Sequence, residues 1–130
     1  MPPAEARRTV LVVDDDREMS SIIQKVLTRE HYDVRTAEDG EEALQAMRKR
    51  PADIVVADWK MPVLDGMRLI ELVKREFPRA KVIMITAFGE VDEYLEAMTR
   101  GAYEFLPKPL DIGELKALVN RAAEEQAQRA

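Results

Sequence analysis

The sequence predicts an α/β fold built on a doubly wound, five-stranded parallel sheet. Short apolar runs alternate five times with amphipathic stretches of helical period, and most of these runs end in a polar side chain or a proline. Strands that alternate with helices in this way form parallel sheets covered by helices on both faces, with right-handed crossovers. We therefore expect a single domain of five strand–helix units.

Three strands are predicted in the first half of the chain, at residues 10–13, 32–37 and 54–57. The third run consists of four small or branched apolar residues that lead straight into Asp58. A run this short, bounded by a charge, is typical of a strand buried on both faces. Pro62 prevents the strand from continuing much further.

Two helices separate these strands. The first is predicted from apolar residues at helical spacing, which are Met19, Ile22, Ile23, Val26 and Leu27. Its N-cap is expected among residues 15–17, where acids suit the positive end of a helix. The second helix follows the turn Asp39-Gly40 and ends at Pro51, and its apolar positions are Ala43, Leu44 and Met47.

The second half of the chain repeats this pattern. Strands are expected at residues 82–85 and 103–106, with a helix at residues 90–100 between them. Leu95 and Met98 are the expected apolar positions of that helix, and Gly101 is its expected C′ cap. The other two helices are marked by apolar residues at helical spacing: Leu69, Ile70 and Val73 after Asp65-Gly66, and Leu115, Leu118, Val119 and Ala122 near the end.

The composition is typical of one soluble globular domain, with 130 residues, 46% of them apolar and 35% charged. We expect a flexible tail at residues 1–8, the folded domain at residues 9–123, and the end of the last helix or a linker at residues 124–130. The net charge of −5 offers no basic face for nucleic acid. The sequence lacks cysteine, a signal peptide and a long apolar stretch, which predicts a cytoplasmic protein without disulfides or membrane contact.

Polar side chains follow four of the predicted strands at their carboxyl ends. They are Asp14 and Asp15 after the first strand, Asp58 after the third, Thr86 after the fourth and Lys108 after the fifth. In open parallel sheets, ligands bind beyond the carboxyl ends of the strands, where the winding reverses. We therefore expect these side chains to converge on one small crevice.

Three carboxylates in one crevice repel one another, and this repulsion favours a bound cation. An all-oxygen set suits Mg2+, which commonly uses one or two carboxylates and leaves room for phosphate. Asp58 can then act as a nucleophile and form an acyl phosphate. Lys108 and the Thr86 hydroxyl are placed to offset charge on the transferred phosphoryl group.

Four motifs complete the pattern. They are Val12-Val13-Asp14-Asp15, Asp58-x-x-Met61-Pro62-x-x-Asp65-Gly66, Ile85-Thr86-Ala87 and Lys108-Pro109. In this order and at these spacings, the motifs resemble the receiver domain of two-component response regulators over residues 10–123. The resemblance implies a flavodoxin-like sheet with the strand order 2-1-3-4-5. It also implies phosphotransfer to Asp58 from a sensor histidine kinase or a phosphotransfer protein.

The same resemblance assigns the metal ligands and the residues that set the lifetime of the phosphoryl group. It implies that Mg2+ is held by Asp15, Asp58 and the backbone carbonyl of Lys60, with Asp14 in contact through water. It also implies that the side chains of Lys60 and Phe88 influence how fast water removes the phosphoryl group. Neither side chain offers a carboxylate or an amide to orient water, so we expect slow self-dephosphorylation.

The resemblance further implies a two-state switch formed by Thr86 and Phe105, and a cis peptide bond before Pro109. Phosphorylation would draw Thr86 inward and let the Phe105 ring enter the vacated space. The face made by the helix at residues 90–100, the strand at residues 103–106 and the final helix would then change. A partner, a second receiver or an attached output domain would read this face, which is also a candidate homodimer interface.

The implied activity is that of a phosphoacceptor, which is not an enzyme in the usual sense but catalyses its own phosphotransfer and slow dephosphorylation. Residues 101–109 resemble most the receivers attached to ATPase-type transcription activators or to hybrid kinases. This segment is not expected to bind nucleic acid directly.

Three other interpretations remain open from the sequence. Asp14-x-Asp16 after a strand fits the nucleophile motif of a haloacid dehalogenase-type phosphatase, although Glu18 replaces the usual Thr or Val and the chain has no room for a cap domain. A receiver-like scaffold that is never phosphorylated would not need the acids, the threonine and the lysine of the predicted site. The presence of all of them argues against this interpretation. A flavodoxin-like flavin binder would need a phosphate loop rich in Ser, Thr or Gly after the first strand, and none is present.

Overall fold

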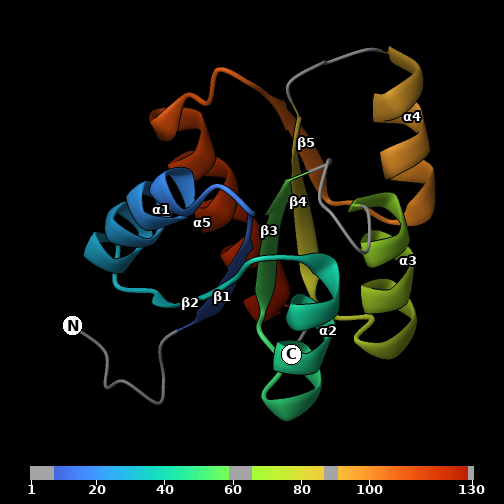
Figure 1. Cartoon of the computed structure of the whole chain (residues 1–130), viewed down its shortest axis with the longest axis horizontal. Coiled ribbons are helices and arrows are strands. Elements are labelled where there is room, and N and C mark those ends of the chain that lie inside the picture. The colour runs from blue at the N-terminus through green and yellow to red at the C-terminus, as the bar shows by residue number, and fades with distance from the viewer. Residues whose placement is uncertain (1–7, 59–65, 87–90, 129–130) are drawn as a thin grey trace.

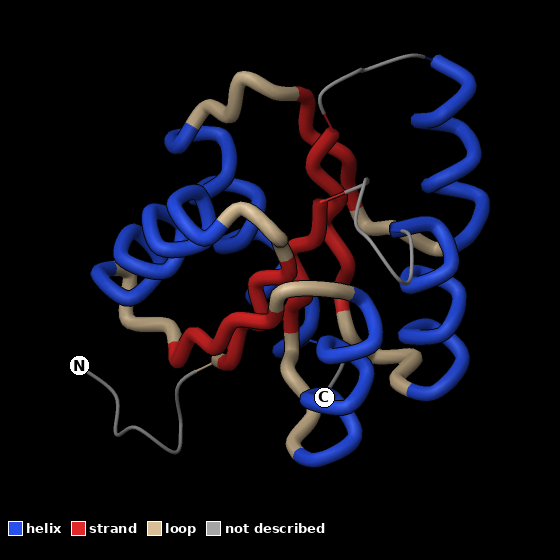
Figure 2. The backbone as a smooth tube through the Cα atoms, in the orientation of Figure 1, coloured by secondary structure: helices blue, strands red, loops and turns tan. Residues whose placement is uncertain are grey.

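The computed structural model describes residues 8–58, 66–86 and 91–128, and it confirms the α/β fold. Ten elements alternate along the chain, as Figures 1 and 2 show: β1 (Thr9–Val13), α1 (Arg17–Arg29), β2 (Asp33–Ala37), α2 (Gly40–Lys49), β3 (Ile54–Asp58), α3 (Gly66–Glu76), β4 (Lys81–Thr86), α4 (Val91–Arg100), β5 (Glu104–Pro107) and α5 (Ile112–Gln128). Each end of each strand lies within one residue of its predicted position.

The five strands form one parallel sheet in the order β2-β1-β3-β4-β5, which confirms the predicted order. Val13 at the end of β1 lies opposite Ala57 of β3, and Asp58 lies opposite Ile85 of β4. The carboxyl ends of these neighbouring strands therefore meet at one edge of the sheet. The candidate site residues belong to this edge.

Helices cover both faces of the sheet, with α1 and α5 on one face and α2, α3 and α4 on the other (Figure 1). Successive strand residues point to opposite faces. Leu11 and Val13 of β1 accordingly pack against α2, α3 and α4, whereas Val10 and Val12 pack against α1 and α5. Each face of the sheet therefore has its own core of buried apolar side chains. Burial in these two cores fixes the position of the strand ends.

The ends of the helices follow the predicted pattern. Asp16 is the N-cap of α1, and its carboxylate accepts hydrogen bonds from the amides of Glu18 and Met19. Gly101 follows α4 with a φ of 114°, and its N–H donates to the carbonyl of Met98. This conformation confirms the predicted C′ cap.

Not every helical position follows the apolar pattern. Ile22 and Leu95, expected on the apolar sides of α1 and α4, are 42% and 54% exposed. Gln126 near the end of α5 is buried despite its polar neighbours, and its amide donates to the backbone carbonyls of Asp53 (3.0 Å) and Arg79 (3.3 Å). Within the described ranges, none of the helices has the length and apolar character needed to cross a membrane.

Candidate functional site

Three carboxylates lie together where β1 and β3 end. Asp14 and Asp15 follow the last residue of β1, and Asp58 is the last residue of the neighbouring β3. One carboxylate oxygen from each residue lies within 4.8 Å of the other two. Asp14 and Asp58 are 4% and 8% exposed, whereas Asp15 is exposed, so the cluster opens to solvent at Asp15. The structure thus brings together the three acids that the sequence placed in one crevice.

Packing and backbone hydrogen bonds hold the two buried carboxylates in place. Every residue of β3 is buried, so Asp58 belongs to a strand that cannot shift without exposing apolar surface. The Asp14 amide donates to the carbonyl of Ala37 on β2 (3.1 Å), and Asp14 Oδ1 accepts from the Asp16 amide (2.9 Å). Groups held in this way need little reorganisation when a ligand arrives.

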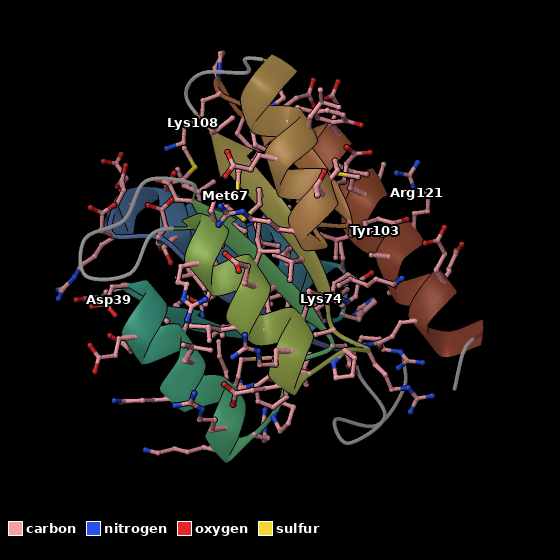
Figure 3. The ribbon with its side chains drawn as sticks, turned by 90° about the vertical axis from the view of Figure 1, so that its right-hand side faces the viewer. Asp39, Met67, Lys74, Tyr103, Lys108 and Arg121 are labelled. Atoms are coloured by element: carbon pink, nitrogen blue, oxygen red, sulfur yellow. The ribbon has the colours of Figure 1, made fainter. Side chains whose placement is uncertain are left out.

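Lys108 brings a positive charge to the carboxylates from the connection between β5 and α5. Its Nζ lies 3.2 Å from Asp58 Oδ2. Its backbone amide donates to the carbonyl of Thr86 (2.6 Å), and its peptide bond to Pro109 is cis, as the resemblance implied. Figure 3 shows Lys108 and Tyr103 at opposite ends of β5, with Lys108 at the carboxyl end.

Thr86 and Phe105 lie on the face of the sheet that α4 covers. Thr86 lies opposite Pro107, and Phe105 lies opposite Met84 on the neighbouring strand, so alternation places both side chains on the same face. They are 1% and 7% exposed. The Phe105 and Tyr94 rings form a T-shaped pair, with 6.0 Å between centroids and 90° between planes. Sequence reasoning missed Tyr94; its aromatic side chain on a mostly polar helix was the available signal.

Burial raises the pKa of the Asp14 carboxyl from its ordinary value of 3.8 to about 6. The hydrogen bond from the Asp16 amide lowers this pKa in part, the negative charge of Asp58 raises it further, and the positive charge of Lys108 lowers it. The raised pKa reflects the free-energy cost of a buried negative charge. A cation held by these carboxylates would offset that cost and favour the ionised form.

The donor atoms of the cluster have the chemistry of a site for a hard cation. Within the described residues, the cluster offers only carboxylate oxygens, which hard divalent cations such as Mg2+ prefer. Asp58 can serve as a nucleophile or a ligand, and Lys108 can balance charge on an incoming anionic group. Three residues of the predicted site region, Trp59, Lys60 and Phe88, lie outside the described residues.

Comparisons with known proteins agree with this geometry. A family model described as the response regulator receiver domain matches residues 10–120. The chain is 37% identical to the DNA-binding transcriptional regulator NtrC of Escherichia coli K12 over 116 residues, and 33% identical to the response regulator protein PilR of Pseudomonas aeruginosa over 117 residues. These matches cover 89% and 90% of this chain but 25% and 26% of the relatives. The chain therefore spans about a quarter of the length of these curated relatives.

Solved structures share the fold over most of the chain. The receiver domain of NtrX from Brucella abortus superposes with a TM-score of 0.83 at 33% identity, covering 88% of this chain and 98% of that domain. A response regulator receiver domain protein from Clostridium thermocellum superposes with a TM-score of 0.88 at 30% identity, covering 95% and 99%.

Proposed function

Because the chain belongs to the response regulator receiver domain family, we propose that it is a phosphorylation-dependent signalling switch with Asp58 as the phosphoacceptor. The observation that carries this proposal is the 3.2 Å distance from Lys108 Nζ to Asp58 Oδ2 within a cluster of three carboxylates. In this pair, Asp58 would be the nucleophile, and Lys108 would offset the negative charge of the incoming phosphoryl group at the same edge of the sheet. The phosphodonor would be a sensor histidine kinase or a phosphotransfer protein.

Mg2+ is the cofactor that we propose for this site. Asp15, Asp58 and the backbone carbonyl of Lys60 would hold the ion, and Asp14 would contact it through water. When bound, the ion supplies positive charge that stabilises the transferred phosphoryl group. The support from this chain is the all-oxygen cluster together with the raised pKa of Asp14, since both favour a cation.

Transfer from a phosphohistidine would be a displacement at phosphorus. An Asp58 carboxylate oxygen forms a bond to phosphorus while the phosphorus–nitrogen bond of the donor breaks, and the donor imidazole keeps the electron pair. The Lys108 ammonium stabilises charge on one phosphoryl oxygen, and the Thr86 hydroxyl donates a hydrogen bond to another. The chain then acts as a phosphoacceptor that assists its own phosphorylation.

The phosphoryl group would signal through Thr86 and Phe105. Nearly two added negative charges draw the Thr86 hydroxyl toward the phosphoryl group. The Phe105 ring is already buried against Tyr94, so we infer that phosphorylation stabilises this inward position rather than creating it. Thr86→Ala is expected to abolish the phosphorylation-induced amide NMR shifts of α4, β5 and α5. Shifts that persist in the variant would remove Thr86 from the switch.

The lifetime of the phosphoryl group would depend on Lys60 and Phe88. Neither side chain can orient a water molecule through a carboxylate or an amide, so we expect slow self-dephosphorylation. Phe88→Glu is expected to speed the release of inorganic phosphate. A release rate equal to that of the native chain would argue against shielding by Phe88.

The face formed by α4, β5 and α5 is where we expect the signal to be read. Tyr94 and Leu95 on this face are 40% and 54% exposed. A partner, a second copy or an attached output domain would bind here. Since the matched relatives are longer proteins that include a DNA-binding transcriptional regulator, we favour an output domain of the ATPase-type activator group. The net charge of −5 gives this segment no basic surface for nucleic acid.

Two rival functions predict different chemistry. A haloacid dehalogenase-type phosphatase would carry the phosphoryl group on Asp14 and use Asp16 as its acid, but the Asp16 carboxylate already accepts two amide hydrogen bonds as a helix cap. An unphosphorylated scaffold would keep the fold and accept no phosphoryl group. Mutation of Asp14 and of Asp58, one at a time, separates these functions. Loss of phosphorylation only in the Asp58 variant would indicate the receiver, and loss only in the Asp14 variant would indicate the phosphatase.

Fluorescence of Trp59, the single tryptophan of the chain, tests the proposal. We expect a saturable response to Mg2+, followed by a response to acetyl phosphate that is lost in Asp58→Asn. Calorimetry with Mg2+ provides a control if the fluorescence does not respond. Absence of both Mg2+ binding and a donor response would favour the scaffold function.

A further inference from the structure

A polar stripe on α1 faces the end of β2 beside the carboxylate cluster. The stripe consists of Arg17, Ser20, Ser21 and Gln24, which recur at spacings of three and four residues. Together with residues 36–38, it lines a groove of about 230 Å³ that also includes Asp14. The groove therefore joins a metal-site carboxylate to a wall of hydroxyl and amide groups.

Ser20 is the buried member of this stripe. It is 6% exposed and lines the groove, whereas Ser21 is exposed. Water is the usual partner of polar groups in a polar cavity that has room for it, and the Ser20 side chain belongs to the lining of such a cavity.

The carboxylate of Asp14, which also lines the groove, can accept further hydrogen bonds. Within the described part of the chain, its carboxylate accepts one hydrogen bond, from the Asp16 amide to Oδ1. A carboxylate has about four lone-pair sites. The groove thus places a donor hydroxyl and an acceptor carboxylate around a volume sufficient for several water molecules, at about 30 Å³ each in the liquid.

The charges around the groove favour water over a small anion. Asp14 and Glu38 both line it, and the one cation of the lining, Arg17, is paired with Glu38 at 2.5 Å. An anion would meet two carboxylates and a guanidinium that is already engaged. Water can donate hydrogen bonds to the carboxylates and accept one from the Ser20 hydroxyl. It therefore suits a lining that contains both acceptors and a donor.

We propose that Ser20 is a positioning residue whose hydroxyl holds ordered water against the Asp14 carboxylate, so that the groove forms the outer hydration shell of the metal site. This inference rests on the proposed Mg2+ site, in which Asp14 contacts the ion through water. Groups in the outer shell of a metal site orient the inner ligands and tune the affinity for the metal. Ser20 acts on the ion only through water and Asp14.

Mg2+ calorimetry on the full chain tests this role with three variants. Ser20→Ala removes the hydroxyl and is expected to weaken Mg2+ binding about 10-fold, the lower range for outer-shell changes. Ser20→Thr keeps the hydroxyl and is expected to retain most of the native affinity. Thr28→Ala is the matched control, because it removes an exposed hydroxyl of α1 that does not line the groove, and it should bind Mg2+ as the native chain does.

Urea unfolding without Mg2+ separates this role from a structural one. If Ser20→Ala lowers stability but leaves the Mg2+ affinity unchanged, the positioning role is wrong. A high-resolution crystal structure is the second readout, and we expect a water hydrogen-bonded to both Ser20 Oγ and the Asp14 carboxylate. Absence of that water also overturns the inference. Failure of the native chain to bind Mg2+ would instead refute the proposed metal site, and the crystallographic water would still decide the role of Ser20.

Discussion

Asp14 occupies an unfavourable position for a charged side chain. It is 4% exposed and shares its corner of the sheet with two other carboxylates. The hydrogen bond from the Asp16 amide and the positive charge of Lys108 lower the pKa of Asp14 in part, but it remains raised to about 6. A buried carboxyl that lowers the stability of the folded chain and lies beside the proposed phosphoacceptor is typical of a functional site.

In Mg2+-free protein, we expect Asp14 to lower the free energy of unfolding as the pH rises. Between its ordinary pKa of 3.8 and its folded pKa of about 6, the folded state binds a proton that the unfolded state has lost. Stability therefore falls through this range, and the loss is complete above it, at no more than about 3 kcal/mol. Urea unfolding across this range measures the effect. The same pH dependence in native protein and in Asp14→Asn would contradict the assignment, since the variant should lack this fall.

Two residues with a left-handed backbone predict opposite effects of substitution. Gly101 has a φ of 114°, and an added Cβ would lie 2.8 Å from Lys74 Cγ, so Gly101→Ala is expected to lower stability by about 1–2 kcal/mol. His31 is an exposed non-glycine residue with a φ of 70°, so His31→Gly is expected to raise stability by roughly 0.5–1 kcal/mol. Thermal unfolding of both variants checks the signs, and a stabilised Gly101→Ala would contradict the backbone argument.

Individual site residues were predictable where chemistry and strand ends coincide. Asp58 and Asp14 each follow an apolar run, so a parallel sheet places both at the carboxyl ends of strands. Ser20 and Tyr94 were not predictable in this way. The role of each depends on which neighbour the fold brings against it: the end of β2 for Ser20 and the Phe105 ring for Tyr94.

At the scale of elements, α5 is attached to the opposite edge of the sheet from the carboxylates. The Gln126 amide donates to the carbonyls of Asp53 and Arg79, and its side-chain oxygen accepts from Arg8 at 3.0 Å. Asp53 in turn accepts from the amide of Thr9 through its carboxylate (2.9 Å). One side chain thus connects the last turns of α5 to three separate segments of the chain.

We expect Gln126→Ala to lower the free energy of unfolding by about 1–3 kcal/mol, because it removes two part-buried hydrogen bonds to the carbonyls of Asp53 and Arg79. The last turns of α5 should also exchange their amide hydrogens faster than in the native chain. Gln45→Ala on the exposed side of α2 is the matched control and should change neither quantity. Unchanged hydrogen exchange at the end of α5 would show that Gln126 does not hold this helix.

The boundaries of the elements were largely predictable, since apolar runs, caps and glycines mark them locally. The exposure of individual helical side chains was harder to predict. Leu95 fits the helical apolar pattern but remains exposed on α4, and Gln126 breaks the pattern but is buried. Periodicity describes a single helix and contains no information on the distant segments that cover it or supply its hydrogen-bond partners.

At the scale of the whole molecule, strand order decides the site. Alternation of strands and helices predicts a parallel sheet but not which strands are neighbours, and the order 2-1-3-4-5 came from the family resemblance. With this order, β1 and β3 are adjacent, which brings Asp14, Asp15 and Asp58 together. β4 and β5 then place Thr86 and Lys108 at the same edge. Two filled cores, one on each face of the sheet, hold this edge in position, so the carboxylate cluster and Lys108 are preformed.

The measurement that tests the central claim most directly is the intact mass of the chain after incubation with Mg2+ and acetyl phosphate. We expect one added phosphoryl group on the native chain that is labile to hydroxylamine, as an acyl phosphate should be. Asp58→Asn should gain no such group, whereas Asp14→Asn should be modified more slowly but at the same residue. A phosphoryl group that persists in Asp58→Asn, or that is lost only in Asp14→Asn, would contradict the assignment of Asp58 as the phosphoacceptor.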